Sequence, residues 1–102
     1  MDRIATLREV LAQNPSDAFA RYGLAMEFAN IGQIEAALNE FKALLNTSPD
    51  YTPGYQMAAQ TLMKAGREDE ARKVLQDGIS CATRTGNQHA RSEMEALLDE
   101  LR

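Results

Sequence analysis

An internal repeat with an interval of 34 residues limits the folds available to this 102-residue sequence more than any other feature. At this interval Gly32 aligns with Gly66, and small or large apolar residues then coincide in pairs. The pairs are Ala25 with Ala59, Phe28 with Leu62, Ala37 with Ala71, and Phe41 with Leu75. Self-similarity of this kind indicates stacked supersecondary units, because one such unit cannot bury its apolar face alone.

The first unit has the apolar spacing of two helices separated by a glycine. One helix is expected to follow the candidate N-caps Ser16 and Asp17, and Gly32 ends it because glycine readily adopts the left-handed conformation. A second helix is expected from Ile34 until Pro49 stops it. The residues on one face of the first helix are Leu24, Ala25, Phe28 and Ile31.

The second unit repeats this plan. A helix is expected over residues 51–65, with Asp50 as its N-cap and Gly66 at its end. The next helix starts near Arg67 and opens with three acidic residues, which complement the positive end of the helix dipole. Two pairs at i,i+4 spacing are expected on its outer face, Glu68 with Arg72 and Asp69 with Lys73.

Two flanking helices complete the expected organisation. Residues 2–13 form half a repeat, since Leu7 lies one interval before Phe41. Thr83 stands where the first unit has Pro49, so the preceding helix is expected to run longer, as far as the turn at residues 85–87. The final helix is apolar on one face and charged on the others, as a capping helix requires. We therefore expect one domain made of a half-repeat (1–14), a first repeat (15–48), a second repeat (49–85) and a C-terminal capping helix (86–102).

These residues resemble the tetratricopeptide repeat (TPR), whose 34-residue helix-turn-helix pattern is W-x2-L-G-x2-Y, then A-x3-F, then P. The first unit offers Arg21, Leu24, Ala25, Phe28, Ala37, Phe41 and Pro49, and the second offers Tyr55, Ala58, Ala59, Leu62, Ala71, Leu75 and Thr83. Arg21 departs from the family's aromatic residue. The resemblance covers nearly the whole chain and implies an all-α, right-handed solenoid of antiparallel helix pairs with about six helices. The paired alanines and the large apolar residues between them are then expected in the core.

The resemblance also implies a concave groove, lined by the first helix of each unit, that binds a peptide or helix of a partner protein. The residues expected to line it are Phe19, Tyr22, Met26, Ala29, Asn30, Gln56, Gln60, Met63 and Lys64. Phe19, Tyr22 and Met26 share one helix face, and aromatic and methionine side chains suit binding surfaces. The alternative is that Phe19 and Tyr22 pack against the first helix. Only Lys64 and Arg91 supply cations near the groove, so a neutral or apolar peptide fits it better than a chaperone-tail carboxylate.

Composition excludes several further classes of function. A net charge of −4 argues against nucleic-acid binding, and the chain has no long apolar run that would span a membrane. Cys81 has no partner for a disulfide, which favours a cytoplasmic location. Cys81 and His89, the only residues of their kinds, are too few for a metal site and lack an oxyanion site. We therefore expect no catalytic residue, cofactor or metal. The alternative function is a homodimer built through the apolar face of Phe19, Tyr22 and Met26. A third hypothesis is that the chain is a fragment of a longer array.

Overall fold

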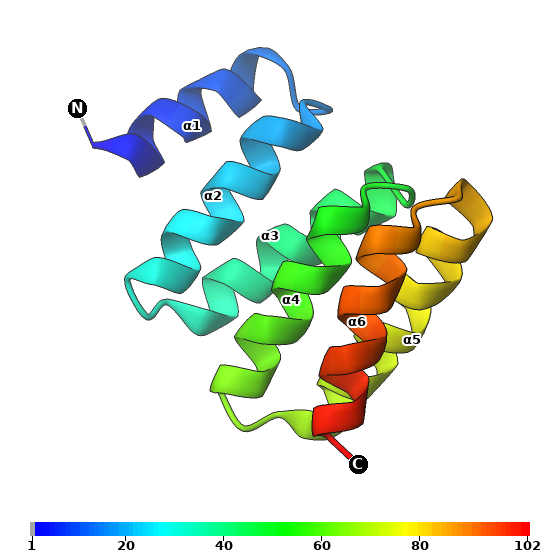
Figure 1. The fold of residues 1–102 in the computed structure, drawn as a ribbon. Helices are drawn as coiled ribbons and strands as arrows, with labels where there is room; N and C mark the ends of the chain where they lie inside the picture. Colours follow the sequence, from blue (N-terminus) through cyan, green and yellow to red (C-terminus); the bar gives the residue numbers. More distant parts are fainter. Residues whose placement is uncertain (1) are drawn as a thin grey trace. The chain divides into compact units, whose positions relative to one another are not determined.

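The computed structural model describes residues 2–102, which form six α-helices and no strand, as expected from the repeats (Figure 1). The helices are α1 (Arg3–Gln13), α2 (Ala18–Asn30), α3 (Ile34–Thr47), α4 (Thr52–Lys64), α5 (Glu68–Thr85) and α6 (Gln88–Glu100). Contacts within the chain divide it into two compact units, Met1–Ser48 and Pro49–Arg102.

Side-chain caps begin three of the helices. The carboxylates of Asp2 and Asp17 accept hydrogen bonds from the backbone N–H groups three residues later, at 2.8 and 3.0 Å, and the Asn87 amide oxygen does the same at 3.1 Å. Helices α2 and α4 each end two residues before a glycine. Gly32 and Gly66 have φ angles of 81° and 75°, a region that other residues rarely adopt, so glycine suits the turn that ends each helix. These local signals set the helix bounds close to those expected from the sequence.

Two details of unit 2 differ from the expectations. Tyr51, not Asp50, is the N-cap of α4, and the Asp50 carboxylate instead accepts a hydrogen bond from Arg84 at 2.5 Å. The expected pair of Asp69 with Lys73 does not form. Asp69 pairs with Arg72 at 2.6 Å, and Lys73 pairs with Asp77 at 3.9 Å, one turn further along α5. The pair of Glu68 with Arg72 is confirmed at 3.7 Å.

Unit 1 has its core where α2 packs between α1 and α3. All the repeat-paired apolar residues of this unit are buried, as expected. These are Ala25, Phe28, Ala37 and Phe41. Ile31, which the spacing placed on the same apolar face, is 59% exposed because α2 ends at Asn30 and Ile31 belongs to the turn. The apolar face of α2 therefore reaches the surface at the C-terminal end of the helix.

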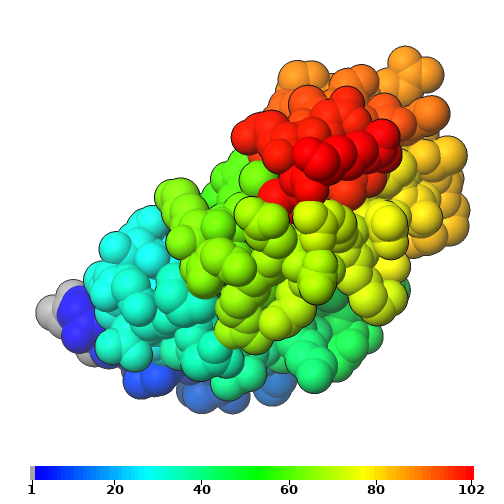
Figure 2. Space-filling model, turned by 90° about the horizontal axis from the view of Figure 1, so that it is seen from below, coloured from blue at the N-terminus to red at the C-terminus, as the bar shows by residue number. Residues whose placement is uncertain are grey.

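Unit 2 has its core between α4, α5 and α6, and Figure 2 shows α6, in orange and red, lying against α5, in yellow. The repeat-paired residues Ala59, Leu62, Ala71 and Leu75 are buried, as expected. The three helices approach one another closely at Gly78 of α5. A Cβ atom built on Gly78 would lie 2.5 Å from Met94 Sδ of α6 and 2.7 Å from Tyr55 Cβ of α4. Glycine is thus required there by space and not by backbone conformation.

Helix α5 has 18 residues, four more than α3, and ends in a left-handed Gly86. This confirms the longer helix expected from Thr83. Arg72, in the second turn of α5, donates a hydrogen bond to the backbone oxygen of Leu101 at 2.6 Å. The start of α5 is therefore attached to the end of α6.

Candidate partner-binding surfaces

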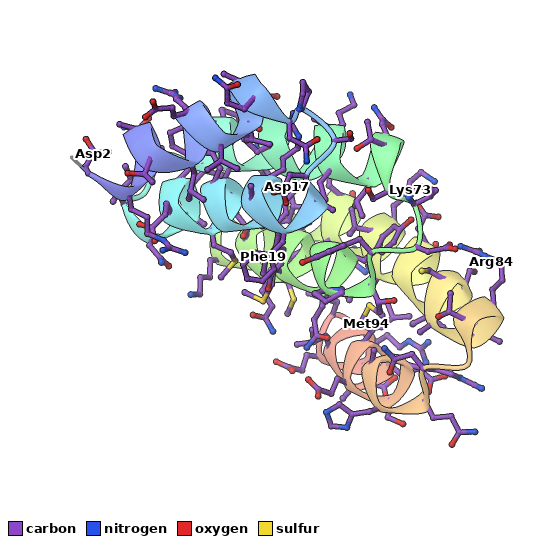
Figure 3. All side chains as sticks on the ribbon, turned by 90° about the horizontal axis from the view of Figure 1, so that it is seen from above. Asp2, Asp17, Phe19, Lys73, Arg84 and Met94 are labelled. Carbon is purple, nitrogen blue, oxygen red and sulfur yellow. The ribbon has the colours of Figure 1, made fainter. Side chains whose placement is uncertain are left out.

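The residues expected to bind a partner are divided between the two units, with Phe19, Tyr22, Met26, Ala29 and Asn30 on α2 and Gln56, Gln60, Met63 and Lys64 on α4. Phe19 lies at the second position of α2, just after the cap formed by Asp17 (Figure 3). Its side chain is 73% exposed. Met26 and Ala29 are half-buried and Asn30 is exposed. An exposed phenylalanine on a well-capped helix is a ready contact for a partner, because its apolar area is still available for burial.

Tyr22 has a different environment from Phe19, although the two lie three residues apart. It is half-buried, and its ring meets the ring of Phe41 on α3 edge to face, with centroids 6.5 Å apart. Tyr22 thus has an aromatic contact within unit 1, with a residue of α3. The structure supports an intramolecular role for Tyr22, whereas the Phe19 side chain is mostly open to solvent.

On α4, Gln56 is engaged within its own unit. Its amide nitrogen donates to a Glu93 carboxylate oxygen of α6 at 2.8 Å, and the other oxygen of Glu93 pairs with His89. Gln60 and Met63 are half-buried, and Lys64, the last residue of α4, is exposed. Glu93 was missed by the sequence analysis, because no periodicity links residues 37 positions apart. Of the four α4 residues, Gln56 is therefore already hydrogen-bonded in the unbound chain.

Tyr55 links the first turn of α4 to the residues that precede the helix. Its hydroxyl donates to the backbone oxygen of Pro49 at 2.7 Å. Burial raises the pKa of Tyr55 above its usual value of 10.0, and the negative charges nearby act in the same direction, against the opposing effect of Arg84. The phenol thus keeps its proton and its hydrogen bond in the folded chain beyond the pH at which a free tyrosine ionises.

A family comparison decides how these helices are to be understood. The family model described as Tetratricopeptide repeat matches residues 28–98, which is more than half of the chain. The chain belongs to the tetratricopeptide repeat family. The TPR resemblance drawn from the repeated residues is confirmed.

Individual TPR proteins are similar to most of the chain. A TPR repeat-containing protein of Pseudomonas aeruginosa is 26% identical over 98 residues, which cover 96% of this chain and 93% of that protein. The solution structure of a TPR domain protein from Salinibacter ruber is 30% identical with a TM-score of 0.81, over 87% of this chain and 90% of that one.

A more distant TPR structure has the same fold. The TPR2B-domain:pHsp70 complex of yeast Sti1 gives a TM-score of 0.89 at 15% identity, over 96% of this chain and 78% of that one. At that identity the likeness concerns the fold alone. Together these structures confirm the expected fold class, an all-α TPR solenoid.

Arg21 stands at the position where the TPR pattern has its first aromatic residue. Its guanidinium donates to Glu40 of α3 at 2.7 Å and to the backbone oxygen of Pro15 at 3.2 Å. A half-buried ion pair thus joins α2 to α3 where the family pattern has an aromatic side chain.

Cys81 and His89, the only residues of their kinds, have separate environments in this TPR domain. Cys81 is buried, with its sulfur 3.6 Å from the Thr52 hydroxyl and 3.5 Å from the Pro49 oxygen. His89 is exposed and pairs with Glu93. Residues 2–102 contain no group of three metal-ligating side chains, and none of their helices is both long and apolar enough to cross a bilayer.

Proposed function

We propose that this TPR domain is a non-enzymatic interaction module that binds a peptide or helical segment of a partner protein through the exposed faces of α2 and α4. TPR domains are in general protein-interaction modules, and the TPR2B domain of yeast Sti1 is itself seen in a complex with pHsp70. The single observation that carries the proposal is the exposure of Phe19, a large aromatic side chain on the helix that the family uses for binding. A role as a cytoplasmic adaptor is part of this proposal.

The chemistry of these faces favours a partner segment that is apolar and weakly charged. Phe19 and Met26 offer area and adaptability, while Asn30 and Gln60 offer amide groups to a peptide backbone. Lys64 is the only cation of the proposed set. A single lysine cannot supply the several cations that a carboxylate clamp needs, so a strongly acidic segment is a poor partner for these faces.

The experiment is a selection of random peptides on the intact domain, followed by affinity measurements by fluorescence anisotropy. We expect Phe19→Ala to weaken the selected peptides about tenfold or more, because truncation of an interfacial aromatic anchor removes a large share of the binding free energy. Val10→Ala is the matched control, since Val10 is also an exposed apolar side chain of unit 1. Selected peptides that bind both variants equally well would refute a binding role for the α2 face.

The alternative function is self-association, in which a second copy covers Phe19. The same exposed ring supports it, because an aromatic that suits a peptide also suits an isologous contact. Under this alternative the chain is a homodimeric assembly unit, and the α2 face has no site left for a peptide in the dimer.

A further inference from the structure

A second apolar surface of unit 1 lies at the opposite end of α2 from Phe19. It is a cavity of about 440 Å³ between the start of α1, marked by Asp2 in Figure 3, and the turn that follows α2. Its apolar lining comes from Ile4, Phe28 and Ile31. Ile31 is 59% exposed although it is a large aliphatic residue. The volume falls in the range of pockets that hold small ligands, and burial of Ile31 would be favourable.

The charged groups around this cavity are unequally satisfied. Arg3 of α1 pairs with Glu27 of α2 at 2.8 Å, which closes one side. The Asp2 carboxylate is used as the N-cap of α1. Arg8 remains. Its guanidinium carbon lies 5.4 Å from the centroid of the Phe28 ring, and none of the ion pairs formed by residues 2–102 includes it.

We propose that this cavity is a docking site for a partner segment that carries a large apolar side chain and a nearby Asp or Glu. The apolar side chain covers Ile31 and Ile4, and the carboxylate pairs with Arg8. Three observations lead to this occupant. The cavity is open and apolar, its two acidic groups are already engaged, and its remaining cation rests on an aromatic ring with its N–H groups available.

A side-chain carboxylate fits better than a chain terminus, because one guanidinium provides a single fork of donors. The Phe28 ring beneath Arg8 also holds the guanidinium in place, so that less freedom is lost when the pair forms. The inference does not depend on the proposed function, since it uses neither Phe19 nor any residue of α4.

The test is a titration of the ¹⁵N-labelled full chain, followed by NMR, with short acetylated and amidated peptides. Each peptide carries one leucine and one glutamate separated by none to three serine or glycine residues. The matched peptides have glutamine for glutamate, or alanine for leucine. We expect amide shifts confined to residues 2–8 and 27–33, and the glutamine peptides should bind about three- to fivefold more weakly, as loss of an exposed ion pair predicts.

Two protein variants assign the contacts. Arg8→Gln should bind the glutamate peptide only as well as the glutamine peptide, whereas Lys42→Gln removes another exposed cation of unit 1 and should bind like the wild type. Ile31→Ser should abolish binding of both peptides, with Val10→Ser as its control. Thermal melting establishes that each variant is folded.

The proposal is overturned by shifts that lie elsewhere, by the absence of shifts at millimolar peptide, or by unchanged glutamate binding in Arg8→Gln. It is equally overturned if the same amides shift with the concentration of the protein alone and Ile31→Ser splits a dimer. In that case a second copy occupies the cavity. Neither result bears on Phe19, so failure here and failure of the proposed function are distinguishable.

Discussion

Two aromatic side chains on α2 show how differently neighbouring residues contribute. Phe19 is mostly exposed, whereas the ring of Tyr22 rests against Phe41. We expect Phe19→Ala to leave the free energy of unfolding within about 0.5 kcal/mol of wild type. Tyr22→Ala should lower it by about 1–3 kcal/mol, because it removes an aromatic contact with the core. Urea denaturation followed by circular dichroism measures both values.

The outcome separates binding from folding. A double variant at both positions, the obvious choice from the sequence, would mix the two effects, since only Phe19 can be removed without disturbing the core. A loss of several kcal/mol in Phe19→Ala would show that Phe19 belongs to the core, and the proposal for the α2 face would then be withdrawn.

The hydroxyl of Tyr55 gives a prediction that depends on pH. At neutral pH, Tyr55→Phe should lose about 0.5–1 kcal/mol of stability with the hydrogen bond to Pro49. The pKa of Tyr55 is raised in the folded state, so its stabilising contribution is complete below the ordinary tyrosine pKa of 10.0 and is lost as pH rises through the folded value. The stability difference between wild type and variant should therefore shrink above pH 10. Urea midpoints measured from pH 8 upward test this, and a constant difference would contradict it.

Pairs that join distant residues could not be predicted from spacing. The caps at Asp2, Asp17 and Asn87 involve backbone groups only three residues away, so the local sequence contains all the information. Asp50 was misjudged because Arg84, 34 residues later, takes its carboxylate. The hydrogen bond of Gln56 to Glu93 and the stacking of Arg8 on Phe28 likewise depend on how helices cross. These are the contacts that decide which predicted site residues remain available.

Packing between helices depends on one glycine in unit 2. A Cβ on Gly78 would come within 2.7 Å of Tyr55 Cβ, an atom next to the backbone, so α4 would have to move. We expect Gly78→Ala to lower the free energy of unfolding by about 1–3 kcal/mol, because the overpacking outweighs the gain in helix propensity of roughly 1 kcal/mol. Chemical denaturation measures the change.

Gly23 of α2 provides the matched control. A Cβ there would meet Leu7 of α1 at 3.5 Å, an ordinary contact. Gly23→Ala should therefore be neutral or stabilise the chain by up to about 1 kcal/mol. If both variants were stabilised equally, the close approach of α4, α5 and α6 at Gly78 would be disproved.

The mass of the whole chain in solution distinguishes the proposed function from its alternative. As a peptide-binding module, the chain should remain at its monomer mass of 11.3 kDa over a wide range of concentration. Light scattering coupled to size-exclusion chromatography measures this. A dimer that Phe19→Ala splits would favour the assembly unit, whereas a dimer that Phe19→Ala leaves intact would place the contact elsewhere.

The repeat made the helices of the whole chain predictable, because one interval fixes the type and the order of the elements together. Helices α2 and α4 begin 34 residues apart, as do α3 and α5. The partners of α6 were less predictable, since α6 stands outside the repeated pattern and its polar contacts depend on the helices it meets.

The long α5 limits how such a chain can be lengthened. Helix α6 begins 36 residues after α4, at Gln88, so the two additional residues take it out of the 34-residue register. A duplicated copy of residues 15–48, inserted after Ser48, would have helices spaced at the 34-residue interval on both sides of it. The same copy placed after α6 would begin out of phase. Growth by duplication is therefore expected at the middle of this sequence and not after α6.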